Sequence, residues 1–350
     1  MQKKIHSFLI GLFLFPILSY GQSSGSSTYA FLNLPFSARS IAMGGNFLSI
    51  YDNDISLALS NPSLISAEMN NKIDLSFVDY FSDINYGSVS YGLNLEKLGT
   101  FIVNMQFIDY GKFEYATETG ERLGSFTAGD YAMSLGWSRP ISPNIIIGAN
   151  LKGLYSNYES YNSFGLAVDV AATYLLEKRN ISASLIFRNI GTQIKTFTPQ
   201  NSEDLPFEIQ AGFSKALEHL PLRFSLLLTQ LQKWDLTYDE QLINPNNQTI
   251  ISGEETSSGK IDDFADNLMR HIVIGVELSP IKALSLRLGY NYLKRKEMTI
   301  PARLSTVGFS WGFGVNIYKF RINYARNAQH LSPSPNYFSV TTDLDQIIGK

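Results

Sequence analysis

Apolar and polar residues alternate along most of this chain from residue 72 onward. Between residues 284 and 292, for example, Leu or Tyr occupies every second position, and small or polar residues stand between them. This period of two is typical of a β-strand with two different faces. The pattern predicts fourteen strands, at residues 72–80, 84–93, 99–110, 126–138, 144–156, 163–176, 180–190, 206–215, 221–231, 270–279, 282–293, 303–314, 317–326 and 336–344.

The predicted strands are long, since most run about nine to fourteen residues and strands of soluble sheets average about five or six. A tilted strand of about ten residues crosses a bilayer. An even number of strands lets antiparallel neighbours close into a ring, and closure is needed because a sheet in lipid cannot leave an unpaired edge. The predicted fold class is therefore all-β: an antiparallel transmembrane β-barrel of fourteen strands over residues 72–344.

Charged residues of the predicted strands fall on the small, polar face, whereas Asp79 and Asp109 of the apolar face sit at strand ends. A Lys or Arg on the lipid side costs roughly 2–4 kcal/mol at the bilayer midplane, so we expect the apolar face to meet lipid. The candidate lumenal charges are Asp130, Lys152, Asp169, Arg188, Glu208, Arg223, Glu277, Arg287, Lys319 and Arg321. They would either select solutes or pair with one another as salt bridges.

The links between predicted strands alternate in length. Links after even-numbered strands are short, such as residues 96–97, and most links after odd-numbered strands are longer, with a short exception near Ser82. Outer-membrane barrels have this arrangement of periplasmic turns and external loops. The longer links, which we expect on the external side, are residues 111–125, 191–205, 232–269 and 294–301.

The first 21 residues have the features of an export signal. Two lysines precede an apolar core at residues 8–18, and the small residues Ser19 and Gly21 stand where a signal peptidase cleaves. We predict that residues 1–21 are a signal peptide, that the mature chain begins near Gln22 and that it resides in the outer membrane. A permanent anchor is the alternative, but the core is shorter than the roughly 20 residues of a spanning helix.

Composition narrows the classes of partner and chemistry. Charged residues make up 17% of the chain, below the usual quarter or so, and aromatic residues make up 13%. A net charge of −3 gives no field for a polyanion, so no nucleic acid partner is expected. The chain has no cysteine, which excludes disulfides and thiolate chemistry.

Residues 22–71 lack the alternation and are predicted to form a plug, or hatch, inside the barrel. A short helix is expected at residues 55–59 with Asp54 as its N-cap, and Asn61-Pro62 ends it because the residue before proline is disfavoured in the α region. The apolar residues of this helix need burial, and the lumen of a fourteen-stranded barrel needs filling. A floppy tether is the alternative.

Catalytic and metal-binding patterns are weak. His219, His271 and His330 fall in separate links or at a strand start, and no HExxH motif occurs, so we predict no metal site, no cofactor and no enzymatic activity. The acidic residues within the link 232–269 would form either a cation site or a solvated acidic loop.

Several short motifs in the N-terminal segment resemble one known family. Residues 29–35 read YAFLNLP, and Tyr324-Ala325-Arg326 precede the last predicted strand. The candidate plug-motif residues are Ser37, Ala38, Arg39, Gly44, Gly45, Asn61 and Pro62. With these motifs the mature chain resembles the PorV/PorQ family of the type IX secretion system, which is itself similar to the FadL family of outer-membrane transporters of hydrophobic compounds.

The resemblance implies a fourteen-stranded barrel with an N-terminal hatch in the outer membrane of a Bacteroidetes-type bacterium. It also implies a surface attachment complex with PorV, the sortase-like PorU and PorZ, which fastens exported cargo to anionic lipopolysaccharide. Many barrels end on an aromatic residue, whereas this chain ends Ile347-Ile348-Gly349-Lys350. The last strand is therefore expected to end near Leu344, with a short tail at residues 345–350.

Two functions follow from these predictions. The first is a non-enzymatic scaffold of the attachment complex, surrounded by outer-membrane lipid and docking PorZ, PorU and PorV on external loops, especially 232–269 and 191–205. The alternative is a FadL-like outer-membrane transporter of hydrophobic small molecules, with a route past the hatch or through a lateral gap in the wall. A soluble lipid-binding β-protein is a third possibility.

Overall fold

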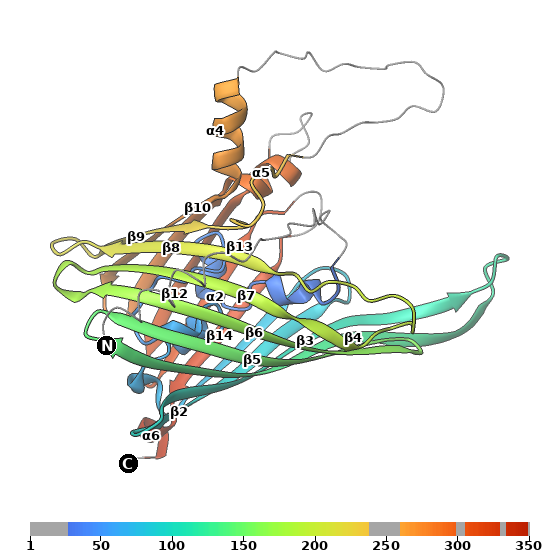
Figure 1. Cartoon of the computed structure of the whole chain (residues 1–350), viewed down its shortest axis with the longest axis horizontal. Coiled ribbons are helices and arrows are strands. Elements are labelled where there is room, and N and C mark those ends of the chain that lie inside the picture. The colour runs from blue at the N-terminus through green and yellow to red at the C-terminus, as the bar shows by residue number, and fades with distance from the viewer. Residues whose placement is uncertain (1–26, 238–259, 299–304, 330–333, 349–350) are drawn as a thin grey trace, which may run out of the picture.

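The computed structural model describes residues 27–237, 260–298, 305–329 and 334–348, and its main feature is a closed barrel (Figure 1). Each strand pairs antiparallel with both neighbours, and β1 pairs with β14 to close the ring. The fold class predicted from the alternating pattern is confirmed. The strands are β1 (Lys72–Asp79), β2 (Asn85–Leu95), β3 (Gly99–Ala116), β4 (Arg122–Ser142), β5 (Ile145–Tyr158), β6 (Tyr161–Leu176), β7 (Ile181–Lys195), β8 (Glu208–Ala216), β9 (Leu222–Leu228), β10 (Ile272–Ile281), β11 (Leu284–Asn291), β12 (Phe309–Ile317), β13 (Phe320–Asn327) and β14 (Asn336–Asp343).

The largest difference from the predicted elements is a long hairpin. β3 and β4 run through most of the link predicted at residues 111–125. Phe113 and Phe126 face each other across the two strands with ring centroids 5.2 Å apart, and such cross-strand pairs stabilise a hairpin. The hairpin projects past the rest of the barrel at the right of Figure 1.

Short helices occupy parts of other links. α4 (Lys260–Arg270) ends the longest link, and α5 (Tyr292–Met298) covers the start of the link predicted at residues 294–301. The turn between β6 and β7 holds η4 (Glu177–Arg179), and α6 (Leu344–Ile348) forms where a tail was expected.

The two faces of the wall differ as the alternation predicts. Met133, Leu151 and Leu288 are each more than half exposed on the outside, whereas Lys152 and Arg287, which neighbour two of them in sequence, are buried inside. The exterior therefore carries apolar side chains that the protein itself leaves uncovered. Among the described residues, no helix has both the length and the apolar character needed to cross a membrane.

Residues 28–71, here called the inner segment, lie within the ring of strands, where their blue helices are visible in Figure 1. α2 packs against β11 to β14, α3 packs against β1, β2 and β14, and η2 packs against β4 to β6. The helices are η1 (Ala30–Asn33), α2 (Ala38–Ala42), α3 (Ile55–Ala58), η2 (Pro62–Leu64) and η3 (Ala67–Met69). The signal peptide predicted at residues 1–21 lies outside the described residues.

Glycines in the wall let the inner segment approach closely. A Cβ on Gly289 would lie 1.9 Å from the carbonyl carbon of Met43, and a Cβ on Gly148 would lie 2.4 Å from that of Pro62. These contacts are with backbone atoms, which cannot rotate away, so only glycine fits. Gly153 on the same strand as Gly148 has open space around it and carries no such constraint.

Candidate functional site

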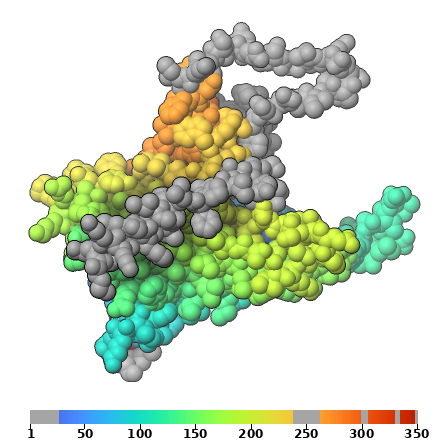
Figure 2. Space-filling model, viewed as in Figure 1, coloured from blue at the N-terminus to red at the C-terminus, as the bar shows by residue number. Residues whose placement is uncertain are grey.

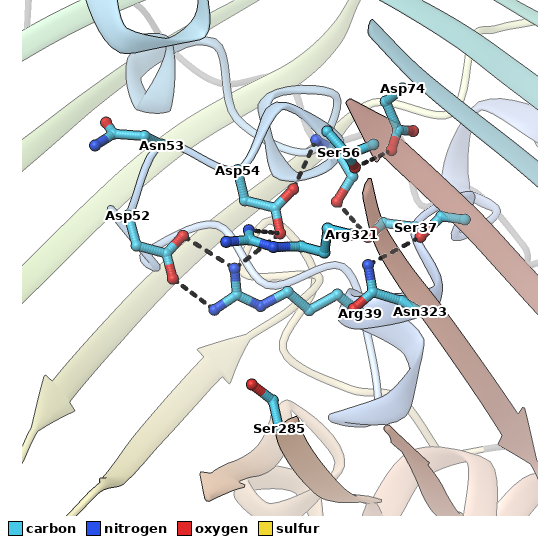
Figure 3. Close-up of polar contacts among 12 residues, drawn as sticks. Ser37, Arg39, Asp52, Asn53, Asp54, Ser56, Asp74, Ser285, Arg321 and Asn323 are labelled. Carbon is cyan, nitrogen blue, oxygen red and sulfur yellow. Dashed lines mark hydrogen bonds and ion pairs between the residues drawn. The ribbon is translucent and has the colours of Figure 1, made fainter. Parts of the chain in front are cut away.

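The inner segment and the wall meet in a cluster of buried charges, here called the charged junction, around Arg39 (Figure 3). The guanidinium of Arg39 lies 2.8 Å from a carboxylate oxygen of Asp54 and 2.5 Å from one of Asp52. On its other side it lies 2.8 Å from a carboxylate oxygen of Glu277 in β10. Arg39 is only 3% exposed, so its charge is balanced by protein carboxylates in place of water.

Two helix caps place the side chains of the inner segment at this junction. Ser37 caps α2, since its hydroxyl accepts a hydrogen bond from the backbone N–H of Ser40, and Arg39 follows in the first turn. Asp54 caps α3 by accepting from the N–H of Ser56 at 3.1 Å. The second oxygen of Asp54 accepts a hydrogen bond from Arg39 of α2. One carboxylate therefore caps α3 and also connects α3 to α2.

The wall completes the junction from four strands. Glu277 and Arg287 are cross-strand neighbours on β10 and β11, and Arg287 Nε donates to Glu277 at 2.6 Å. Arg321 of β13 lies 3.3 Å from Asp54, and Arg223 of β9 lies 3.5 Å from Asp52. Burial alone would raise the pKa of the Asp54 carboxyl, but Arg39 and Arg321 outweigh burial and hold that pKa well below its ordinary value.

A polar cavity of about 460 Å³ opens beside the junction. Its lining includes residues of the β10–β11 turn and Asn316 at the end of β12, so it lies toward the side of the short turns. The charged lining residues are Arg39, Asp52, Arg223, Glu277, Lys282, Arg287 and Arg321. Five cations against two carboxylates give this cavity a positive field, which suits water or a small anion better than an apolar solute.

The structure brings four of the ten candidate lumenal charges to the junction: Arg223, Glu277, Arg287 and Arg321. The structure corrects the predicted strand position of a fifth candidate, Lys319. It lies in the turn between β12 and β13, partly exposed, and its Nζ donates to the carbonyl oxygen of Gln346. The predicted strand began at residue 317, but β13 begins only at Phe320 because Tyr318 adopts a left-handed φ of 55° and turns the chain.

The other five candidate charges are buried elsewhere in the lumen. Lys152 and Asp169 form a pair 2.7 Å apart, so the salt-bridge alternative holds for them. Asp130 accepts from two tyrosines, and Arg188 donates to the carbonyl oxygen of Leu32 at 3.1 Å. Glu208 accepts from a backbone N–H of the β9–β10 link.

The plug-motif residues lie where the inner segment touches the wall. Gly44 has a φ of +106°, and a Cβ there would meet Val273 at 2.9 Å, while one on Gly45 would meet Leu227 at 3.3 Å. Asn61 donates to the carbonyl oxygen of Leu48 at 2.6 Å and caps η2, which Pro62 begins. Ala38 is fully buried in α2.

Sequence reasoning missed the pairing partners of Arg39. Asp52 and Asp54 are visible in the sequence as an acidic pair after the SAR and GG motifs, but the pair alone does not say which cation it meets. Glu277 is separated from Arg39 by 238 residues, and that contact depends on the closure of the barrel.

Where the structure describes them, the histidines and the acidic residues of the link 232–269 are not grouped as a metal site, and Glu254 and Glu255 of that link lie outside the described residues. Both ring nitrogens of His271 lie within hydrogen-bond distance of backbone carbonyl oxygens, those of Thr229 and Trp234, and His330 lies outside the described residues. Within the described ranges, no three His, Asp or Glu side chains are grouped as a metal site. Burial would raise the pKa of Asp266 in α4, but hydrogen bonds from Tyr292, Arg270 and Lys296 lower it to about 2.

Comparison with known proteins gives a likeness of fold. No family model matches the sequence, and neither does any curated protein. Among solved structures, the toluene transporter TodX of Pseudomonas putida matches with a TM-score of 0.54 and 15% identity over 87% of this chain and 97% of TodX. A TodX deletion mutant described as a monoaromatic hydrocarbon channel matches with a TM-score of 0.52 and 13% identity over 88% of this chain and 97% of the other. The chain therefore shares the fold of these hydrocarbon channels, and the resemblance to the PorV/PorQ family stays a prediction.

Proposed function

We propose that this chain is a non-enzymatic outer-membrane barrel that passes hydrophobic small molecules. The observation that carries the proposal is the likeness of the whole fold to a toluene transporter, which extends over 97% of that protein. The alternative named from the sequence is thereby preferred to the scaffold function.

Location in the outer membrane is part of this proposal. It is supported by the closed ring of antiparallel strands, which leaves every strand paired on both sides, and by the exposed apolar residues on its exterior. The predicted signal peptide is consistent with export.

The inner segment acts in this proposal as the plug that controls passage. It fills the lumen with apolar clusters, and Arg39 fixes it to Glu277 of the wall. A solute therefore needs the inner segment to shift, or a gap beside it. The charged junction sets the free-energy cost of such a shift, because moving α2 separates buried ion pairs.

Heterologous uptake tests the proposal. The chain would be produced in a Gram-negative host that lacks a hydrocarbon channel, and the initial rate of labelled toluene uptake would be compared with that of the empty vector. We expect faster toluene uptake with no change in the permeation of a polar β-lactam. Equal toluene rates at equal amounts of folded barrel in the membrane would refute the proposal.

A second proposal keeps the scaffold function in the type IX secretion system. It is favoured by exposed aromatic residues in the link between β9 and β10. Trp234 and, in α4, Phe264 are each about half exposed, and their tilted rings have centroids 5.1 Å apart. PorV, PorU and PorZ would dock there. Crosslinking in intact cells followed by gentle detergent extraction tests it, since a chain that always emerges alone contradicts a stable complex.

A further inference from the structure

The polar cavity beside the charged junction, here called the junction cavity, is formed by two parts of the protein. Arg39 and Asp52 of its lining come from the inner segment, and Arg223, Arg287 and Arg321 come from the wall. Its volume of about 460 Å³ is roughly that of fifteen water molecules in the liquid. The cavity is therefore large enough for a polyatomic solute, which would lie beside residues of both the inner segment and the wall.

The junction cavity lies at the end of the barrel opposite the long hairpin. Arg223 stands at the start of β9 and Lys282 stands in the turn between β10 and β11, so the cavity is close to the short turns. Figure 2 shows the yellow turn between β8 and β9 at the left of the molecule and the teal hairpin of β3 and β4 at the right. The pattern of link lengths predicts that the short turns are periplasmic, and in that orientation the cavity faces the periplasm.

The ion pairs of the junction use every hydrogen-bond donor of Arg39. Its Nε donates to Glu277, one Nη donates to Asp52 and Asp54, and the other donates to Asp52 and Glu277. These five bonds account for all five N–H groups of a guanidinium. Arg39 therefore has no donor left for a solute, and its charge is already matched by protein carboxylates.

The other cations of the junction cavity keep donors in reserve. Arg287 and Arg321 each donate through Nε and Nη1, in each case to one carboxylate and one asparagine side chain. In the part of the chain that the structure describes, the Nη2 atoms of both residues and the Nζ of Lys282 make no hydrogen bond to protein. Arg223 approaches Asp52 only to 3.5 Å. Donors from four side chains are thus available to one solute.

The guanidinium of Arg287 is held in place before any solute arrives. Glu277 accepts from its Nε at 2.6 Å, and Asn323 accepts from its Nη1 at 2.9 Å. Gly314 of β12 leaves room for it, since a Cβ there would lie 2.8 Å from Nη1 and 2.9 Å from Nη2. A donor that is already oriented loses little conformational entropy when it binds, which favours affinity.

The junction carries more positive than negative charge. Five cations line the cavity, whereas three carboxylates contact them, those of Asp52, Asp54 and Glu277. Two positive charges are therefore left without a carboxylate, and like charges held close together repel. A doubly charged anion offsets both charges, and guanidinium donors match the oxygen geometry of phosphate.

We propose that the junction cavity binds a doubly charged phosphate-type anion, either inorganic phosphate or a phosphate monoester, and that this anion holds the inner segment against the wall. The donors are the Nη2 groups of Arg287 and Arg321, together with Arg223 and Lys282. Because the site exists only while the inner segment meets the wall, binding stabilises the seated segment by mass action. The proposal adds a periplasmic ligand to the barrel and does not depend on which solute the barrel passes.

Equilibrium dialysis of the purified full chain in phosphatidylcholine nanodiscs tests binding, with radiolabelled inorganic phosphate as the probe. The pH is mildly alkaline, so that phosphate is mostly doubly charged, and chloride keeps the ionic strength constant. We expect saturable binding of about one phosphate per chain. Dimethyl phosphate, which carries a single charge, should compete at least tenfold less well. Equal competition by dimethyl phosphate would overturn the proposal and indicate the phosphodiester of a lipid headgroup as the ligand.

Lys282→Gln removes one donor without touching the ion pairs of the junction. The dissociation constant for phosphate should rise roughly tenfold, because a hydrogen bond to a charged group is lost. Lys178→Gln is the matched control, since Lys178 is also an exposed lysine in a short turn, between β6 and β7, and does not line the cavity. Its dissociation constant should stay within about twofold of wild type. Absence of saturable binding, or equal effects of the two variants, would overturn the proposal.

The hold on the inner segment is measured with a thiol at a buried position of that segment. Ser49→Cys supplies the thiol, and maleimide reacts with it only when the segment moves. Phosphate at ten times its dissociation constant should slow this reaction roughly tenfold, and the same concentration should slow it only about twofold with Lys282→Gln. Phosphate that binds without slowing the reaction, or chloride that slows it equally at the same ionic strength, would overturn the proposal.

Discussion

Replacing Arg39 tests whether the charged junction holds the inner segment in place. Arg39→Gln removes the cation that pairs with Asp52, Asp54 and Glu277 at 2.5–2.8 Å. Removing one partner of a buried ion pair destabilises the folded arrangement by about 3–5 kcal/mol. We take the lower end, about 3 kcal/mol, because Asp54 retains Arg321 at 3.3 Å and Glu277 retains Arg287 at 2.6 Å. The population with a displaced inner segment should then rise roughly 100-fold.

The absence of cysteine from the chain makes this population measurable. Ser49 of the inner segment is fully buried, and a thiol introduced by Ser49→Cys can react with a membrane-impermeant maleimide only when the segment moves. The reaction rate in the Arg39→Gln background should be about 100-fold that of the parent.

Arg122→Gln is the matched control, because Arg122 also pairs with a glutamate, at 3.0 Å, but its side chain is 76% exposed. It should change the maleimide rate by less than about fivefold. If the rate with Arg39→Gln also stays within that range, the junction does not hold the inner segment and the reasoning fails.

Three further predictions address contacts, lipid exposure and acid sensitivity. Gly289→Ala should raise the same maleimide rate by roughly 10-fold, since overpacking costs about 1–3 kcal/mol. Gly153→Ala is the control and should leave the rate unchanged, because there is open space around Gly153. Equal effects of the two variants would contradict the close approach of the inner segment to Gly289. Leu151→Arg, on the exterior, should destabilise the barrel in urea titrations from vesicles by about 2–4 kcal/mol, and no loss would argue against a lipid-facing position. The pKa of Asp266 is lowered to about 2 from an ordinary value of ~3.9, so its contribution to the α4–α5 contact is present above pH ~4 and is lost as the pH falls toward 2. Trp234 fluorescence, with the other two tryptophans replaced by phenylalanine, should therefore change between those pH values and should not do so in Asp266→Asn.

The barrel could be predicted because every strand is subject to the same physical constraint. Lipid on one side and a polar lumen on the other require alternation, and a charge on the wrong face is costly, so the sequence displays both signals many times over. The same reasoning placed Asp54 as a helix cap, because capping depends on residues only two or three positions away.

The rest of the site depends on contacts that no local pattern encodes. Arg39 meets Glu277 only because the closed wall brings β10 beside α2, and the sequence holds no marker of that pairing. The hairpin at residues 111–125 was missed because the bulge at Gly111 shifts the alternation by one position, which makes a continuous strand look like an ended one. Lys319 was misplaced because the turn at Tyr318 is two residues long and interrupts an otherwise regular pattern.

The most direct test of the central claim compares two phenotypes of one deletion strain. The initial rate of labelled toluene uptake and the amount of surface-attached secreted protein would be measured in the deletion strain, the parent and the complemented strain. A hydrophobic-solute channel predicts that toluene uptake falls on deletion and returns on complementation, with surface-attached protein unchanged. Unchanged toluene uptake together with loss of surface-attached protein would contradict the channel and favour the scaffold.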